Sequence, residues 1–140
     1  MEGKKAMTVI LHSGDMDKAH AAFILATGAA AKGIETTIFF TFWGLNIIKK
    51  DGADSAKLSK MNMIGLGKMM MKRMMKKKNV ATLKELIKDA KELGVHLIAC
   101  EMTMDLMNVP KETLISEVTG IGGVGAYLDK ASDAQINLFV

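Results

Sequence analysis

The single cysteine, Cys100, is the residue of this chain best suited to covalent chemistry. It ends an apolar run, residues 94–100, that is typical of a buried parallel strand. The next residues, 101–107, are good helix formers without a breaker, so we expect the thiol at a strand-to-helix junction. Free helical N–H groups and the helix dipole favour a thiolate there, which serves as a nucleophile and as a sulfur acceptor. The alternative is a small buried hydrophobic residue, and position alone leaves both interpretations open.

The composition indicates one domain, residues 1–140, in a reducing compartment. This length is sufficient for a hydrophobic core, and no Pro-, Ser- or Gly-rich linker divides the chain. A single cysteine excludes an internal disulfide and any CxxC redox or zinc site, which favours the cytoplasm. The apolar stretch 6–11 is too short for a signal peptide, and the run 36–48 is too short and too polar for a membrane span.

Apolar periodicity and turn residues predict alternating strands and helices. We expect strands over residues 7–12, 35–41, 95–99, 117–121 and 136–140. We expect helices over residues 16–32, 44–50, 82–93, 110–116 and 124–132. This alternation predicts an α/β fold, a five-stranded, mostly parallel sheet with helices on both faces in three layers. The order 2-1-3-4-5 is common for such a sheet, and it is the order we expect.

In that order the first and third strands are neighbours, and a ligand would bind beyond their carboxyl ends. The crevice would then unite Cys100 with the turn after the first strand, and the turn after the second strand would lie beside it. The candidate site residues are His12, Ser13, Gly14, Asp15, Thr41, Trp43, Cys100, Glu101, Met102 and Met104. Convergent polar groups in a pocket favour a functional Cys100.

Several of these residues have two interpretations. His12 is placed to orient or deprotonate Cys100, or simply to hydrogen-bond the turn. Glu101 opposes a thiolate, because an adjacent carboxylate disfavours a second negative charge. Met102 and Met104 suit either a soft wall around a polarisable sulfur or ordinary core packing. Trp43 either lines the pocket or covers the edge of the sheet.

Three segments of the chain resemble the DsrE/DsrF-like family, and more closely its DsrE-like sulfur-trafficking branch, often labelled "peroxiredoxin family". They are residues 13–19, 39–45 and 99–107, and the C-terminal residues 123–131 and 136–140 are also similar. The resemblance covers nearly the whole chain. It implies a flavodoxin-like fold, homo-oligomers, and partners of the rhodanese or TusA type. It also implies that Cys100 is the cysteine that carries sulfane sulfur as a persulfide.

The chemistry of such a carrier follows from one thiolate. Cys100 would attack the outer sulfur of a donor persulfide and pass that sulfur to an acceptor thiolate. This exchange requires no metal and no organic cofactor, and the three histidines lack the spacing of a metal site. Without a second cysteine, peroxide chemistry of the two-cysteine kind is excluded. The residues leave open whether the protein is a sulfurtransferase enzyme. They also leave open a non-catalytic ligand-binding or interaction module in which Cys100 is incidental.

The segment 61–79 is unusual because it combines seven methionines with six basic residues and no acid. The 13 basic residues elsewhere face 15 acidic ones, so this segment supplies the whole positive balance of the chain. On a helix, methionines and basic residues would gather on different sides, which suits a membrane surface, an acidic partner or an oligomer interface. Nucleic acid is not expected, because stacking aromatic residues are absent. The alternative is a solvated helix or a mobile insertion. The candidate partner-binding residues are Lys68, Lys72, Arg73, Lys76 and Lys77.

Overall fold

Five parallel strands form the central sheet of the protein, in a computed structural model that describes residues 3–140. The strands are β1 Ala6–Leu11, β2 Glu35–Phe40, β3 His96–Cys100, β4 Gly120–Gly122 and β5 Ile136–Phe139. Their order across the sheet is β4-β3-β2-β1-β5. The α-helices are α1 Met16–Ala31, α2 Gly52–Ser55, α3 Leu66–Lys77, α4 Leu83–Glu92, α5 Glu101–Leu106 and α6 Val124–Ser132. Short 3-10 segments are η1 Phe42–Ile48, η2 Met63–Gly65 and η3 Lys111–Thr113.

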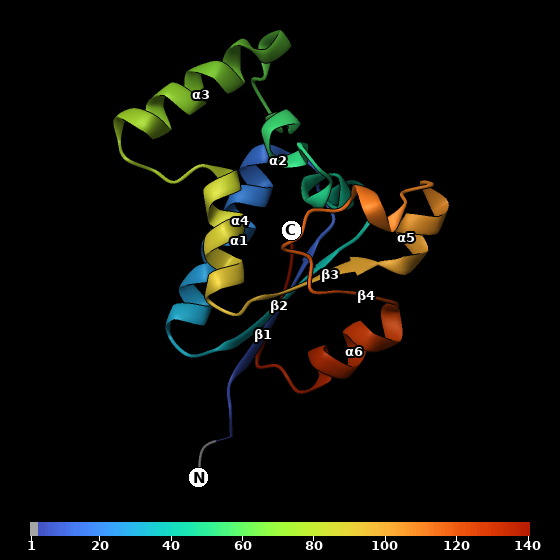
Figure 1. Ribbon diagram of the computed structural model, residues 1–140. Helices are drawn as coiled ribbons and strands as arrows, with labels where there is room; N and C mark the ends of the chain where they lie inside the picture. Colours follow the sequence, from blue (N-terminus) through green and yellow to red (C-terminus); the bar gives the residue numbers. More distant parts are fainter. Residues whose placement is uncertain (1–2) are drawn as a thin grey trace.

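Helices cover both faces of the sheet, as the three-layer prediction required (Figure 1). Helices α1 and α4 pack together on one face, and α6 packs on the other. Two consecutive residues of β2 mark the two faces. The ring of Phe40 lies 5.9 Å from Phe23 of α1, whereas that of Phe39 lies 5.4 Å from Tyr127 of α6. The sheet is therefore a buried central layer.

The expected strand order, 2-1-3-4-5, is wrong in two of its pairings, β1 with β3 and β4 with β5. β2 lies between β1 and β3, so these two strands are not neighbours, and β5 pairs with the other side of β1. The physical reason is burial. Five of the six residues of β2 are buried, which requires a neighbouring strand on each side and a covered face above and below. β4, with three residues of which two are glycines, suits an edge of the sheet.

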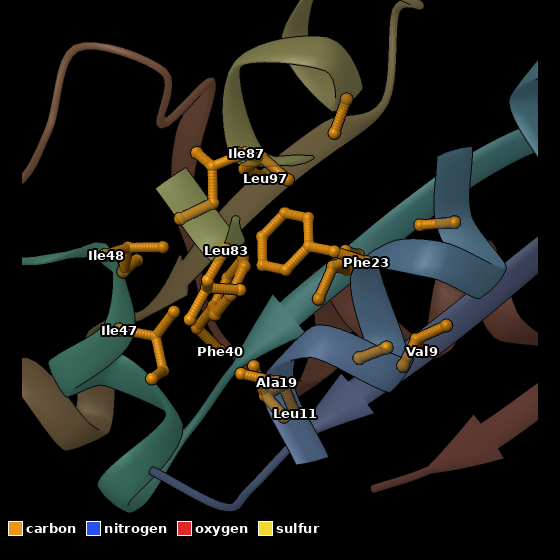
Figure 2. Close-up of a cluster of buried hydrophobic side chains, with 14 of the residues drawn as sticks. Val9, Leu11, Ala19, Phe23, Phe40, Ile47, Ile48, Leu83, Ile87 and Leu97 are labelled. Atoms are coloured by element: carbon orange, nitrogen blue, oxygen red, sulfur yellow. The ribbon is translucent and has the colours of Figure 1, made fainter. Parts of the chain in front are cut away.

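The main core lies between the sheet and the pair α1 and α4 (Figure 2). Small residues on the buried side of α1, such as Ala19 and Ala22, allow the helix to approach the strands closely. Phe23 and Phe40 fill the space between them and are fully buried. Gly44 is needed where η1 crosses the end of β1, because a Cβ there would lie 1.9 Å from the Leu11 carbonyl oxygen. The backbone at the end of β1 is thus tightly packed.

The predicted helix over residues 124–132 is present as α6 with the same bounds. The helix expected over residues 110–116 is instead the single turn η3, because the backbone beyond it bonds elsewhere. The Ile115 N–H donates to the Ile48 carbonyl at 2.8 Å, and the Lys50 N–H donates to the Thr113 carbonyl at 2.8 Å. Within residues 3–140, no helix has both the length and the apolar composition needed to cross a membrane.

Candidate functional site

Cys100 is the last residue of β3, and α5 begins at the next residue, as the sequence predicted. Side chains alternate along a strand, and Leu97 and Ala99 belong to the core beneath α1 and α4. Cys100 therefore points to the opposite face, the one that α6 covers. It pairs with Gly122 of β4 and is only 4% exposed. The thiol thus sits at the N-terminal end of a short helix, in a sheltered position.

Thr103 holds α5 against the end of β2, and the sequence analysis did not identify it. Its hydroxyl oxygen accepts the N–H of Phe42 at 3.0 Å and lies 3.1 Å from the hydroxyl of Thr41. Thr103 is fully buried, whereas its partners Thr41 and Phe42 are half-buried. The one feature of the sequence that could have indicated this role is a threonine within a short apolar helix, three residues after the cysteine. This contact fixes the helix that begins at Cys100.

The other predicted site residues line a cavity of about 630 Å³ at the carboxyl end of β1. They are His12, Ser13, Gly14, Asp15 and Trp43. The Ser13 hydroxyl accepts the N–H of Asp15 at 3.1 Å and donates to its carboxylate at 3.0 Å, which shapes the turn before α1. A Cβ on Gly14 would lie 2.7 Å from the Trp43 carbonyl oxygen, so glycine permits the close approach of the two loops.

Aromatic rings surround His12 at the edge of this cavity. The ring of His12 lies 5.4 Å from that of Trp43 and 5.5 Å from those of Phe42 and Phe139. Trp43 is 56% exposed, so more than half of its surface is open to solvent. The packing holds the imidazole among rings from two segments of the chain, η1 and β5.

Lysines dominate the charge of the cavity. Four of them line it, together with one carboxylate, Asp15: Lys18, Lys49, Lys50 and Lys57. Lys49 donates to the side-chain oxygen of Asn46 at 2.9 Å, and Lys18 lies 3.6 Å from Asp15. An anion entering the cavity would meet a net positive potential. Sequence reasoning missed Lys49, Lys50 and Lys57, because they belong to the long connection between β2 and α4.

The structure therefore divides the predicted site into two groups. Glu101, Met102 and Met104 remain beside Cys100 on α5, and Thr41 contacts the same helix through Thr103. The residues from the turn after β1 lie in the cavity with Trp43, and Cys100 is not among the cavity-lining residues of the described chain. The single crevice expected between β1 and β3 does not form, since β2 separates these strands by two spacings, about 10 Å.

The two methionines on α5 differ in burial. Met104 is 8% exposed and belongs to the main core, whereas Met102 is 57% exposed. Only Met102 is thus available to a molecule that approaches from solvent. Across residues 3–140, no cluster of three or more His, Cys, Asp or Glu side chains is arranged to hold a metal ion.

The chain belongs to the DsrE/DsrF/DrsH-like family, whose sequence model matches residues 3–58 and 52–139. One relative, the uncharacterized protein YrkE of Bacillus subtilis, is 45% identical, and the match covers 99% of each chain. Another, the sulfur carrier protein DsrE2 of Allochromatium vinosum, is 36% identical over the full length of both chains.

Solved structures confirm the fold class. MTH1491 from Methanobacterium thermoautotrophicum, a protein of unknown function, superposes with a TM-score of 0.67 at 11% identity. That match covers 98% of this chain and 100% of the other. The YchN protein from E. coli superposes with a TM-score of 0.60 at 12% identity, over 99% of this chain and 100% of its own. At such low identity the likeness concerns the fold alone.

Asp17 anchors the wall of the cavity to the first turn of α1. Its carboxylate accepts the backbone N–H of Ser59 at 2.8 Å and the Ser59 hydroxyl at 2.5 Å. Burial raises the pKa of Asp17, but the hydrogen bonds from Ser59, its own backbone N–H and nearby Lys18 together lower that pKa below its ordinary value of 3.8. The ionised form is therefore the one that holds the segment containing Lys57 in place.

We predict that replacing Asp17 by Asn destabilises the protein near neutral pH but much less in acid. A carboxyl whose pKa is lowered by folding contributes stability above its unfolded pKa, about 3.9, and loses it as the pH falls through the folded pKa. Urea unfolding of both proteins at about pH 6 and about pH 2.5 measures this difference. An equal difference in unfolding free energy at both pH values would contradict the assignment.

We predict that Thr103→Val destabilises the protein by about 1–3 kcal/mol, because it leaves the part-buried Phe42 N–H without its acceptor. The same change should speed the reaction of Cys100 with a thiol reagent, since α5 is less firmly held. Thr103→Ser is the matched control, because it retains the hydroxyl and should preserve both values more closely. Urea unfolding and the rate of labelling by a chromogenic disulfide are the measurements. An unchanged labelling rate in the valine variant would show that Thr103 does not restrain the thiol.

Proposed function

We propose that this protein carries sulfane sulfur as a persulfide on Cys100 and passes it to partner proteins. The observation that carries the proposal is the position of the sole thiol, at the end of β3 and the first turn of α5. The family, and a full-length relative named a sulfur carrier at 36% identity, support a role in sulfur trafficking. The proposal places this exchange in a reducing, cytoplasmic compartment, where a thiol stays free.

The transfer is an exchange between sulfur atoms with no net oxidation. The Cys100 thiolate attacks the outer sulfur of a donor persulfide, the donor sulfur–sulfur bond breaks, and the donor leaves as a thiolate. Cys100 then holds a terminal sulfur anion. An acceptor thiolate attacks that outer sulfur, and Cys100 leaves as the thiolate it was at the start.

The burial of Cys100 requires a local opening before a partner can reach it. Helix α5 has only six residues, and its outer side chains, Glu101, Met102 and Leu106, are exposed. Short elements at a sheet end open more readily than the central core. In this proposal, a donor or acceptor protein displaces α5 enough to bring its own sulfur to the thiol. The closed state protects the persulfide from other thiols.

Partner proteins of the rhodanese or TusA type fit this role, because each presents a reactive cysteine. Exposed apolar side chains surround the Cys100 end of the sheet, on α5, β4 and α6. They are Met102, Leu106, Ile121, Val124 and Leu128. Exposed apolar groups that gather in one region mark a contact surface. In the proposal this surface receives a second copy of the chain or a sulfur-transfer partner.

We predict that the wild-type protein, incubated with polysulfide, gains the mass of one sulfur atom, because Cys100 is its only thiol. Dithiothreitol should remove the added mass. Cys100→Ser should gain none, whereas Met102→Leu, a matched change beside the thiol, should be labelled like the wild type. Intact-mass spectrometry is the measurement. Equal labelling of the serine variant would refute the carrier role.

We propose a second candidate function, binding of a small organic anion, because the cavity at the end of β1 is independent of Cys100. Its volume of about 630 Å³ falls in the range of small-molecule sites. Four lysines supply positive charge, and the open face of Trp43 offers a surface on which a flat ring can stack. This arrangement favours a nucleotide-like ligand over a bare inorganic anion.

We predict a saturable change in tryptophan fluorescence when adenosine diphosphate is added, because Trp43 is the only tryptophan of the chain. The double variant Lys49→Gln and Lys50→Gln should bind about tenfold or more weakly, which corresponds to about 1.4 kcal/mol. A matched control, Lys88→Gln and Lys91→Gln on α4, removes the same charge far along the sequence from the cavity. Equal affinities of the two double variants would exclude this site.

A further inference from the structure

Helix α3 stands at the margin of the molecule, away from the sheet (Figure 1). None of its side chains is buried, although half of its residues are leucine or methionine. The exposed apolar side chains of the helix and of the turn before it are Met61, Met63, Ile64, Leu66, Met69, Met70, Met71 and Met74. In an ordinary surface helix, a row of apolar side chains like this one packs against the protein core.

Helix α3 does not bury its methionine row against the protein. Lys72 and Lys76 line a cavity between α3 and the body of the protein, and Met75 contacts the core. At about 100° per residue, Met70 and Met74 lie nearly opposite Lys72 on the helix. They are 64% and 56% exposed. Lys72 and Lys76 therefore share the protein-facing side with Met75, whereas Met70 and Met74 face solvent.

The charge of this segment is unbalanced. Residues 61–79 include six basic side chains and no acid. Lys68 donates to the Asp54 carbonyl at 2.6 Å; burial, and then the charge of Lys72, lower its pKa, against a smaller opposing effect of Asp54. The lysines thus repel one another, and an anionic surface outside the chain would relieve that repulsion.

We propose that α3 docks this protein on the surface of a bilayer that contains anionic lipids. Leu66, Met70 and Met74 enter the interface between headgroups and acyl chains, and Arg73 and Lys77 contact the headgroups beside them. A helix with one apolar side, a basic remainder and no acid is typical of interfacial binding. Its 12 residues span about 18 Å, which is too short to cross a bilayer, so in the proposal the helix lies in the plane of the membrane.

The charges favour a bilayer over a second copy of the chain. Two α3 helices packed against each other would bring ten basic side chains together, five from each copy, without one acid from either helix. An acidic protein would neutralise the basic side chains. It would not by itself provide the apolar layer in which the flexible methionine side chains can be buried. The proposal uses no residue near Cys100, so it stands or fails independently of the sulfur-carrier role.

Co-sedimentation with phosphatidylcholine vesicles, with and without phosphatidylglycerol, tests the proposal. The wild type should bind the anionic vesicles and only weakly the neutral ones, and added salt should release it. Met70→Gln with Met74→Gln, and separately Arg73→Gln with Lys77→Gln, should each weaken binding about tenfold or more, or about 1.4 kcal/mol.

Two matched controls separate α3 from general surface effects. Ile24→Gln with Leu25→Gln removes two apolar side chains of α1 that are about as exposed, and Lys88→Gln with Lys91→Gln removes two positive charges from α4. Both should bind vesicles like the wild type. Circular dichroism should show all variants folded, since exposed side chains carry little stability.

Three outcomes would overturn the proposal. The first is no binding of the wild type to anionic vesicles. The second is equal loss of binding in the α1 or α4 controls. The third is a methionine variant that binds vesicles normally but has a smaller mass by light scattering, which would assign the stripe to contact between copies. A further result would be tight binding to polyglutamate, with or without the methionine changes, by a protein that does not bind vesicles. That result would instead make α3 a binding site for an acidic protein.

Discussion

The burial of β2 between β1 and β3 is the constraint on which the rest of this structure depends. A strand buried on both faces needs a bonded neighbour on each side, and β2 obtains them from β1 and β3, the strands that lead to the two groups of candidate site residues. The carboxyl end of β2 therefore links these two groups of residues. Thr41 and Phe42 contact the helix of Cys100, while Trp43, the next residue, lines the lysine-rich cavity.

Local patterns predicted the elements and the fold class, but not which side of each element meets which neighbour. The apolar residues at the end of β2, Ile38 to Phe40, are the sequence feature that indicates a central strand, but they do not identify its two neighbours. The turn from His12 to Asp15 was correctly placed at a strand end, since its residues are consecutive. Lys49 and Lys57 reach the same cavity from an irregular connection, for which no periodicity exists. Likewise, the amphipathic pattern of α3 shows two sides but not their orientation.

Shelter and reactivity conflict at Cys100. The proposed exchange needs access to the thiol, yet Cys100 is only 4% exposed, so its cover must move before sulfur can be transferred. In the proposed carrier, Thr103 bears on both needs through one buried hydroxyl. Its contacts with Thr41 and Phe42 hold a helix of only six residues, and short elements open more readily than the core. A longer helix with a larger core face would have kept the thiol closed.

The exposed methionines of α3 give the protein a different sensitivity to oxidants from that of its thiol. Met70 and Met74 are more than half exposed, whereas Cys100 is nearly inaccessible, so a diffusing oxidant meets thioethers before it meets the cysteine. Oxidation to methionine sulfoxide makes such a side chain polar, and methionine sulfoxide reductases reverse the change. The apolar row of α3 would then disappear under oxidative conditions and return afterwards, while the buried thiol at the end of β3 remained sheltered from the oxidant.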